Sequence, residues 1–139
     1  MAAQRPRSLA DMPPQSKFSI LLGIEILRCT PEEVVCTMTV TEDMSNRNGV
    51  LHGGALMAIA DTAAGTSAFI NSPAEVSNTT VEAKTNFIRP VKLGDTVTAR
   101  CVPVHVGRAT SVLQVIMTRG DGKVVGVTSQ THLYLGWKD

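Results

Sequence analysis

Apolar and polar residues alternate along most of the second half of the chain, in four stretches separated by turn residues. Alternation with a period of two is typical of half-buried β-strands, and it predicts strands over residues 76–88, 96–106, 109–119 and 123–135. In the first of these, Val81, Ala83 and Phe87 fall on one face. Gly-Asp-Gly at 120–122 predicts a hairpin between the last two.

The first half of the chain contains two shorter strand patterns and one long apolar segment. Residues 23–29 and 34–40 flank a polar turn and predict a second hairpin. Residues 16–22 predict a short helix, and residues 41–51 a loop. From 53 to 71 the chain is almost continuously apolar, opens on two glycines and ends at Asn-Ser-Pro, which predicts a long helix. Its apolar residues lie nearly all round, so we expect burial on most sides.

This order of elements predicts an α+β fold. Two strands, one long helix and an antiparallel meander of four strands pack most economically as one sheet wrapped around one helix. With 139 residues and 14.8 kDa the chain has the size of one domain. We expect residues 16–139 to form it, and residues 1–15, which are rich in proline, to be a flexible tail.

Composition excludes some functions and adds little else. A formal net charge of +1, without basic blocks, gives no case for nucleic-acid binding. No apolar run is long enough to span a bilayer, so no membrane segment is predicted. The three cysteines show no paired spacing and predict free thiols in a reducing, cytoplasmic setting. The three histidines form no metal-ligand pattern, and no metal or cofactor is predicted.

The strongest functional signal is Asn46, followed by His52-Gly53-Gly54 and then by Asp61. Asp61 is the one ionisable residue of the predicted long helix. A carboxylate in an apolar setting is costly unless it is paired, hydrogen-bonded or functional, and desolvation makes it a stronger base. A glycine at a helix N-terminus offers a free N–H and the positive end of the helix dipole. Together they suit hydrolysis through an activated water and a polarised carbonyl.

The order of elements and the spacing Asn-x5-His-Gly-Gly-x6-Asp resemble the hot-dog-fold acyl-CoA thioesterases, particularly the phenylacetate-degradation (PaaI-like) type. The resemblance covers residues 23–135. Within that range, Thr80 and the Arg-Pro-x-Lys-Leu-Gly-Asp segment at 89–95 match as well. It implies one long central helix wrapped by an antiparallel sheet of about six strands. It also implies a homodimer, often assembled further into a homotetramer, that hydrolyses acyl-CoA to a free acid and coenzyme A.

The resemblance implies a role for each matching residue. The N–H of Gly53 would polarise the thioester carbonyl, and Asn46 would hold the carbonyl or the water. Asp61 would be the general base or the nucleophile, Thr80 would orient the water, and His52 would fix the loop. Four further residues are expected to contact the substrate: Gly54, Arg89, Lys92 and Arg108. The three basic residues among them would bind the phosphates of coenzyme A.

Spacing along the helix adds an inference of its own. Gly53 and Asp61 are eight residues apart, which is roughly 12 Å of helical rise, too far to act on one carbonyl. We therefore expect a composite active site, with Asn46, His52 and Gly53 from one chain and Asp61 and Thr80 from its partner. The acyl group would lie against helix residues such as Met57, Ala58 and Thr62.

Each residue also has a purely structural interpretation. Asp61 could pair with a buried threonine, His52 could cap the helix, Asn46 could be a turn residue, and Thr80 could be an ordinary strand residue. Two other functions remain open, a non-catalytic acyl-CoA binding module and an acyl-thioester hydratase. The sequence does not distinguish aryl from aliphatic acyl groups, or coenzyme A from acyl carrier protein.

Overall fold

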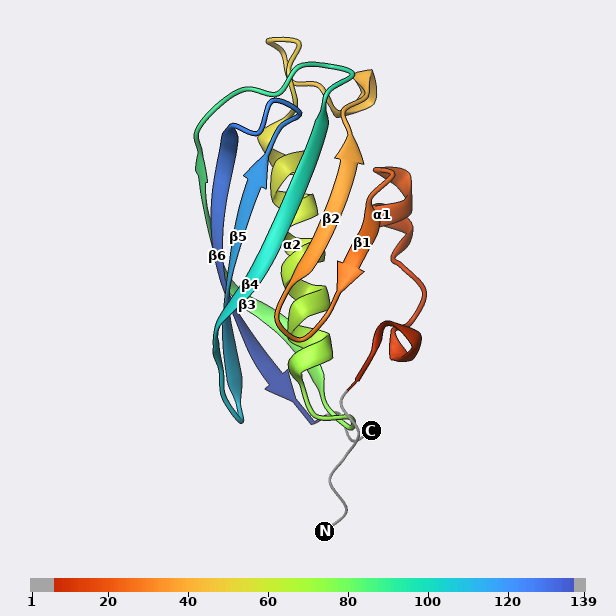
Figure 1. Cartoon of the computed structure of the whole chain (residues 1–139), viewed down its shortest axis with the longest axis vertical. Coiled ribbons are helices and arrows are strands. Elements are labelled where there is room, and N and C mark those ends of the chain that lie inside the picture. The colour runs from red at the N-terminus through yellow and green to blue at the C-terminus, as the bar shows by residue number, and fades with distance from the viewer. Residues whose placement is uncertain (1–6, 137–139) are drawn as a thin grey trace.

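One long helix lies against the concave face of a six-stranded antiparallel sheet in the computed structural model, which describes residues 7–136 (Figure 1). The helix is α2 (Gly53–Asn71), and α1 (Lys17–Leu21) is a single short helix beside the sheet edge. The strands are β1 (Glu25–Cys29), β2 (Val34–Thr39), β3 (Ser77–Phe87), β4 (Thr96–Val106), β5 (Thr110–Thr118) and β6 (Val124–Leu135). This confirms the predicted α+β hot-dog fold, and the bounds of α2 match those expected.

The strand order corrects one expectation. The sheet runs β1-β2-β4-β5-β6-β3, so β3 pairs with β6 at the far edge and β4 pairs with β2. The simple four-strand meander predicted for the second half is therefore wrong. An alternating pattern specifies which face of a strand is buried but not which strand lies beside it. With β3 at the far edge, the two N-terminal strands and the four later strands form one continuous sheet, and this sheet covers the helix.

The core lies between α2 and the inner face of the sheet. The helix contributes Ile59, Ala60, Ala63 and Ala64, each fully buried. Facing them, the strands bring Met38, Val97, Leu113, Val115 and Met117, also fully buried. Small helix side chains allow the close approach of helix and sheet. One face of α2 is left uncovered, however, and carries the exposed residues Gly54, Met57 and Asp61. The helix is therefore buried on three sides only.

Two thiols belong to this core. Cys36 in β2 and Cys101 in β4 are fully buried, and all three cysteines are free. Burial raises the pKa of the Cys36 thiol to about 12 and that of the Cys101 thiol to about 11. Both thiols are therefore protonated and unreactive while the fold is intact.

A β-bulge in β3 changes the faces of that strand. Thr80 pairs with His132 of β6, and the next pair is Glu82 with Thr131, so Val81 is the extra residue. A bulge reverses the alternation of side chains on its two sides. Thr80 therefore points to the helix side of the sheet, whereas Glu82, two residues later, contacts Thr131 on the opposite face. Strict alternation would have placed Thr80 and Glu82 on the same face.

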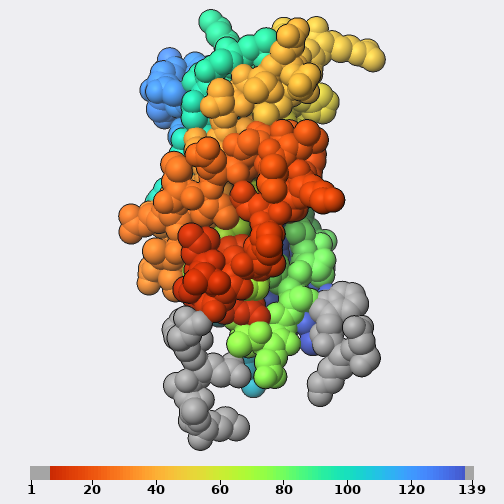
Figure 2. Space-filling model, turned by 90° about the vertical axis from the view of Figure 1, so that its right-hand side faces the viewer, coloured from red at the N-terminus to blue at the C-terminus, as the bar shows by residue number. Residues whose placement is uncertain are grey.

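The N-terminal residues lie against the C-terminal half of α2. The Arg7 guanidinium stacks over the Phe69 ring at 4.2 Å and donates to the Phe69 carbonyl and to Ser72 Oγ. In Figure 2 these red residues lie beside the lime surface of α2. Residues 1–6 of the expected tail lie outside the described residues, and flexibility of residues 7–15 stays a prediction. Among the described residues, no helix is long and apolar enough to cross a membrane.

Candidate active site

His52 forms the N-terminal cap of α2. Its side-chain Nδ1 accepts a hydrogen bond from the Gly54 N–H at 2.8 Å, and its backbone N–H donates to the Met44 carbonyl. Because Nδ1 accepts, the proton of the neutral imidazole is on Nε2. Gly54 is among the residues expected to contact the substrate, and its N–H is engaged by the cap. The contacts of His52 are those of a capping residue that ties the helix start to the preceding loop.

Asn46 organises the loop before the helix. Its Oδ1 accepts hydrogen bonds from the N–H groups of Asn48 and Val50, at 2.9 and 3.3 Å. These two bonds determine the orientation of the side-chain amide, because only its oxygen can accept them. Asn46 is therefore a turn residue, as the structural interpretation held. At the same time its Nδ2, which makes no hydrogen bond to the described residues, remains available as a donor.

A cavity of about 350 Å³ lies at this end of the helix. It is lined by Asn46 and Gly53 together with Leu56, Phe87 and Arg89, among others. The Gly53 N–H makes no hydrogen bond within residues 7–136. A Cβ on Gly53 would lie 3.0 Å from Cε1 of Phe87, so a side chain there would crowd the ring. Gly53 and Asn46, each with an N–H donor that is unengaged within residues 7–136, thus both line one cavity.

Asp61 lies two turns further along α2 and, contrary to expectation, is exposed. The apolar sequence around it predicts a buried carboxylate, but Asp61 lies on the uncovered face of the helix. Its Oδ1 accepts hydrogen bonds from Thr80 Oγ1 at 3.2 Å and from Gln130 Nε2 at 3.0 Å. The structure thus brings Asp61 and Thr80 together within one chain. Asp61 does not line the cavity at Gly53.

A second cavity of about 520 Å³ adjoins Asp61. It lies between α2 and the N-terminal segment, and its apolar lining includes Leu9, Met12, Ile26 and Phe69. Of the helix residues expected to contact the acyl group, Thr62 lines this cavity, whereas Met57 and Ala58 do not. The hydroxyls of Thr62 and Thr66 donate to helix carbonyls four residues earlier. These hydroxyls are already hydrogen-bonded, so the cavity suits a largely apolar group.

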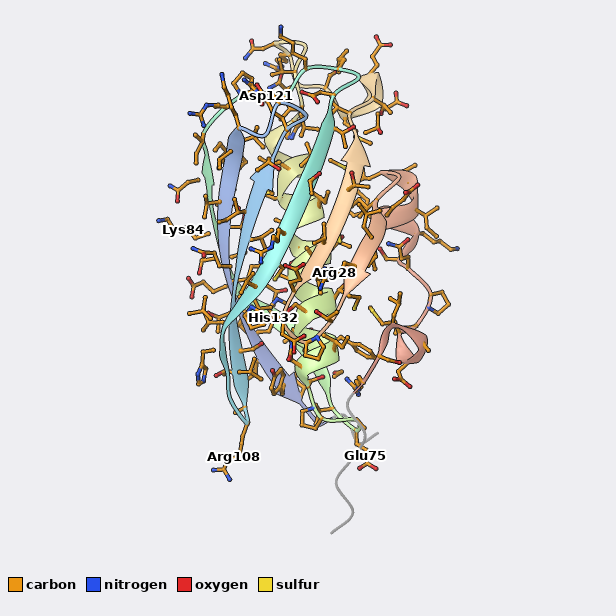
Figure 3. The ribbon with its side chains drawn as sticks, viewed as in Figure 1. Arg28, Glu75, Lys84, Arg108, Asp121 and His132 are labelled. Carbon is orange, nitrogen blue, oxygen red and sulfur yellow. The ribbon has the colours of Figure 1, made fainter. Side chains whose placement is uncertain are left out.

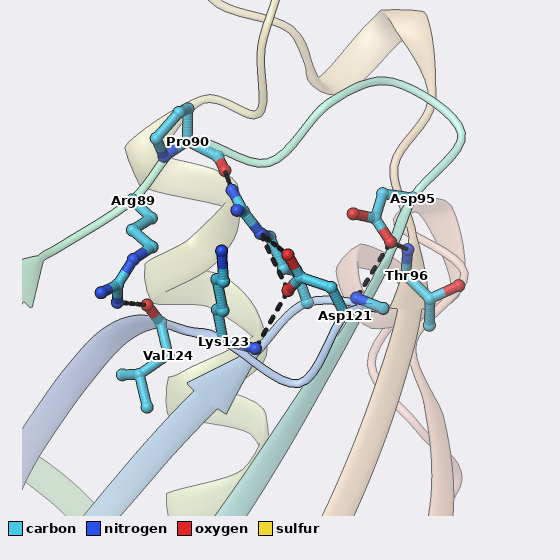
Figure 4. Close-up of polar contacts among 9 residues, drawn as sticks. Arg89, Pro90, Asp95, Thr96, Asp121, Lys123 and Val124 are labelled. Atoms are coloured by element: carbon cyan, nitrogen blue, oxygen red, sulfur yellow. Dashed lines mark hydrogen bonds and ion pairs between the residues drawn. The ribbon is translucent and has the colours of Figure 1, made fainter.

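The three predicted phosphate-binding cations do not lie together. Arg89 lines the cavity at Gly53, and its Nη1 donates to the Val124 carbonyl at 2.7 Å (Figure 4). Lys92 lies in the same region, since its backbone pairs with Val50. Arg108 lies at the opposite end of the sheet from Asp121, whose hairpin adjoins Arg89 (Figures 3 and 4). Of these three cations, Arg89 lines the cavity at Gly53, Lys92 lies beside Val50 of the same cavity, and Arg108 lies at the other end of the sheet.

Three polar residues next to Asp61 were not among the predicted site residues. Gln130 and His132 in β6 are 2% and 1% exposed, and Asn78 in β3 is partly buried. Burial lowers the pKa of the His132 imidazole, against a smaller opposing effect of the Asp61 charge. The available signal was polar residues at 128, 130 and 132, which are successive inward positions of an alternating strand. No group of three metal-binding side chains occurs within residues 7–136.

The fold and the polar residues at the central helix define a hot-dog protein, and known proteins are similar to this chain in sequence and in fold. The thioesterase superfamily model matches residues 48–126. The acyl-coenzyme A thioesterase PaaI of Escherichia coli is 34% identical over 76% of this chain and 74% of its own. The putative esterase ComA2 of Bacillus subtilis is 39% identical over 68% of this chain and 75% of its own.

Solved structures agree with these sequence relatives. The E. coli PaaI structure superposes with a TM-score of 0.82 at 29% identity, covering 87% of this chain and 86% of that one. The chain belongs to the thioesterase superfamily, and its enzyme class is that of a thioester hydrolase.

Proposed function

We propose that this protein hydrolyses an acyl-CoA thioester to a free acid and coenzyme A. The observation that carries the proposal is the pair of unengaged donors, Gly53 N–H and Asn46 Nδ2, lining one cavity at the N-terminus of α2. Two such donors can stabilise the negative charge that develops on a thioester oxygen during attack. The positive end of the α2 dipole acts in the same direction. Three of the relatives are named acyl-coenzyme A thioesterases, which supports coenzyme A as the carrier.

Asp61 would activate the attacking water. A carboxylate accepts a proton from water as the water attacks the carbonyl carbon, and the sulfur leaves with the electron pair of the broken C–S bond. The donors on Oδ1 leave Oδ2 without a hydrogen bond to the described residues. Because Thr80 Oγ1 donates to Asp61, Thr80 can contact the water as an acceptor.

Two half-sites on one chain favour a dimer. Gly53 and Asp61 line different cavities, and eight residues of helix separate them by roughly 12 Å. An active site that uses both therefore takes Asn46 and Gly53 from one subunit and Asp61 and Thr80 from another. In a symmetric pair, each subunit then completes the site of its partner. The same pairing can be repeated in a tetramer, which remains an expectation.

The first experiment measures thiol release from aryl-, short-, medium- and long-chain acyl-CoAs by the wild type and by Asp61→Asn. The variant keeps the shape of the side chain but not its basicity. We expect turnover by the wild type and a loss of two to four orders of magnitude in kcat for the variant. Binding of acyl-CoA without thiol release would replace this proposal with a binding module. A change in enoyl absorbance would indicate a hydratase, and equal activity of both proteins would remove Asp61 from the mechanism.

Mixing two inactive variants tests the composite site. Asn46→Asp retains the oxygen that holds the loop but loses the donor, and Asp61→Asn lacks the base. A mixed dimer has one site with both defects and one with neither. Random pairing should therefore restore about a quarter of the wild-type activity after co-expression. If both groups acted within one chain, mixing would restore nothing. Asn46→Ala, which also loses the loop contacts, is the control for folding.

A further inference from the structure

Gln130 connects the exposed Asp61 with the buried His132. Its Nε2 donates to Asp61 Oδ1 at 3.0 Å, and its Oε1 lies 2.8 Å from His132 Nε2. Gln130 and His132 are almost completely buried, whereas Asp61 is exposed. These contacts form a chain of hydrogen bonds that runs from the buried His132 through Gln130 to the carboxylate of Asp61.

The chemistry of the three groups determines which way each points. An ionised carboxylate can only accept, so the NH₂ of the Gln130 amide must face Asp61. The amide oxygen then faces His132, which must carry a proton on Nε2. Burial lowers the pKa of His132 and favours the neutral ring. Its Nδ1 then accepts, whereas the atom 3.2 Å from it is Asn78 Oδ1, so a hydrogen bond there requires the Asn78 amide to be turned with its nitrogen toward the ring.

The result is a carboxylate with one oxygen held and one oxygen unengaged. Both the Thr80 hydroxyl and the Gln130 amide donate to Oδ1. An aspartate on an exposed helix face would otherwise be free to change rotamer, since a side chain of this kind has several staggered states. Two donors of fixed position from two strands restrict that rotation. With Oδ1 held by donors from the sheet, Oδ2 makes no hydrogen bond to the described residues.

A merely structural network would be an expensive way to fill this position. Burying an amide and an imidazole costs desolvation that hydrogen bonds only partly offset, and apolar side chains of similar volume avoid it. Tyr134, on the same face of β6, has a buried hydroxyl without a hydrogen-bond partner in the described residues. The contact between Gln130 and His132, in contrast, leads directly to the one charged group of the helix, because Gln130 donates to Asp61.

We propose that Gln130 is a positioning residue for Asp61, with its amide oriented by His132, and that Oδ2 is the oxygen that takes the proton from water. The proposal rests on the proposed thioesterase function. It assigns no contact between Gln130 and the substrate. It predicts that loss of Gln130 affects the chemical step through Asp61 and through nothing else.

The test is Gln130→Met, which keeps the length of the side chain and removes both polar ends. With the best acyl-CoA of the panel, we expect kcat to fall roughly tenfold to a hundredfold, and KM to change little. Gln114→Met is the matched control, because Gln114 is exposed on the neighbouring strand β5. Wild-type kcat in Gln130→Met would overturn the inference while leaving thioesterase activity intact. An inactive wild type would instead overturn the proposed function.

A double-mutant cycle separates positioning from general damage. If Gln130 acts through Asp61, adding Gln130→Met to Asp61→Asn should leave the residual activity unchanged. A further loss equal to that seen in the wild type would overturn the inference. Should Gln130→Met fail to fold, nitrogen NMR of the wild-type His132 ring gives the answer without a variant. The Nε2–H tautomer supports the proposed orientation, and the Nδ1–H tautomer contradicts it, because Gln130 would then turn its oxygen toward Asp61.

Discussion

At the scale of single residues, Asp61 and His132 belong to one hydrogen-bonded chain but lie in opposite surroundings. Asp61 is exposed on α2, and His132 is 1% exposed in β6. Burial disfavours a positive charge on the His132 imidazole. The pH therefore acts on the stability of the fold through His132.

Acidification should destabilise the protein through His132. Burial lowers the pKa of this imidazole below its ordinary value of 6.5. As the pH falls through that value, the unfolded chain takes up a proton that the folded chain does not. The stabilising contribution is therefore complete above it and is lost as the pH falls toward the folded pKa. The extra slope is at most about 1.4 kcal/mol per pH unit.

Urea denaturation between about pH 7 and pH 5 measures this slope. His132→Gln should show a shallower loss of unfolding free energy than the wild type. The other two histidines are present in both proteins, so their contributions cancel in the comparison. Parallel slopes for the two proteins would mean that His132 gains its proton equally well in the folded state.

The sequence indicated which residues belong to the candidate site, but not whether each of them is buried or exposed. The motif that contains Asn46, Gly53 and Asp61 is local, and it predicted where the polar groups of α2 would be. The exposure of Asp61 depends on which face of the helix the sheet covers, and that follows from strand order. Gln130 is 69 positions from Asp61 in the chain, so no local pattern could pair them.

At the scale of elements, the contact between α2 and the sheet depends on a glycine in β6. A Cβ on Gly126 would lie 2.9 Å from Leu56 Cδ2 and 3.2 Å from the Asn86 carbonyl oxygen. The side chain could shift, but the carbonyl belongs to the β3 ladder and cannot. Gly65 in α2 is the opposite case, since a Cβ there meets nothing within 4 Å.

Gly126→Ala and Gly65→Ala should therefore change stability in opposite directions. We expect Gly126→Ala to lower the free energy of unfolding by about 1–3 kcal/mol through overpacking. Gly65→Ala should raise it by about 0.5–1 kcal/mol, because alanine loses less conformational freedom in a helix. Thermal unfolding of the two variants beside the wild type gives both values. A neutral Gly126→Ala would show that helix and sheet can separate slightly without cost.

Strands and helix were predictable at this scale, and their neighbours were not. The bounds of α2 follow from its opening glycines and its closing Asn-Ser-Pro, and the approximate ranges of the strands follow from the alternation of apolar and polar residues. The bulge at Val81 and the place of β3 beside β6 depend on pairing between residues far apart in the chain, such as Ser77 with Leu135 and Phe87 with Gly126. Strict alternation therefore assigns Thr80 to the wrong face.

At the scale of the whole molecule, the proposed active site exists only in an assembly. The Gly53 and Asp61 half-sites lie on one continuous helix, whose length cannot change on substrate binding. The uncovered face of α2 carries Gly54, Met57 and Asp61. In the proposed dimer, the Asn46 and Gly53 donors of one subunit lie beside Asp61 of the other. Activity would therefore depend on the fraction of protein that is assembled.

Specific activity should therefore fall on dilution. Once the protein concentration drops below the dissociation constant of the dimer, each lone subunit holds an incomplete site. Initial rates over a dilution series, with carrier protein to prevent surface loss, should decline along the dimer fraction measured by sedimentation. Constant specific activity at concentrations where sedimentation shows monomers would contradict the composite site.

The protonated thiols of Cys36 and Cys101 can report how often the core opens. A thiol-specific alkylating reagent reacts with thiolate, so these two side chains stay silent in the native sheet. They become modified only when the packing of α2 against β2 and β4 opens. Mass spectrometry of the alkylated protein over time then records how often this part of the core opens, with no label introduced. Because the two strands are neighbours, simultaneous modification would mean that they open as one unit, and sequential modification that the strand whose thiol reacts first opens first.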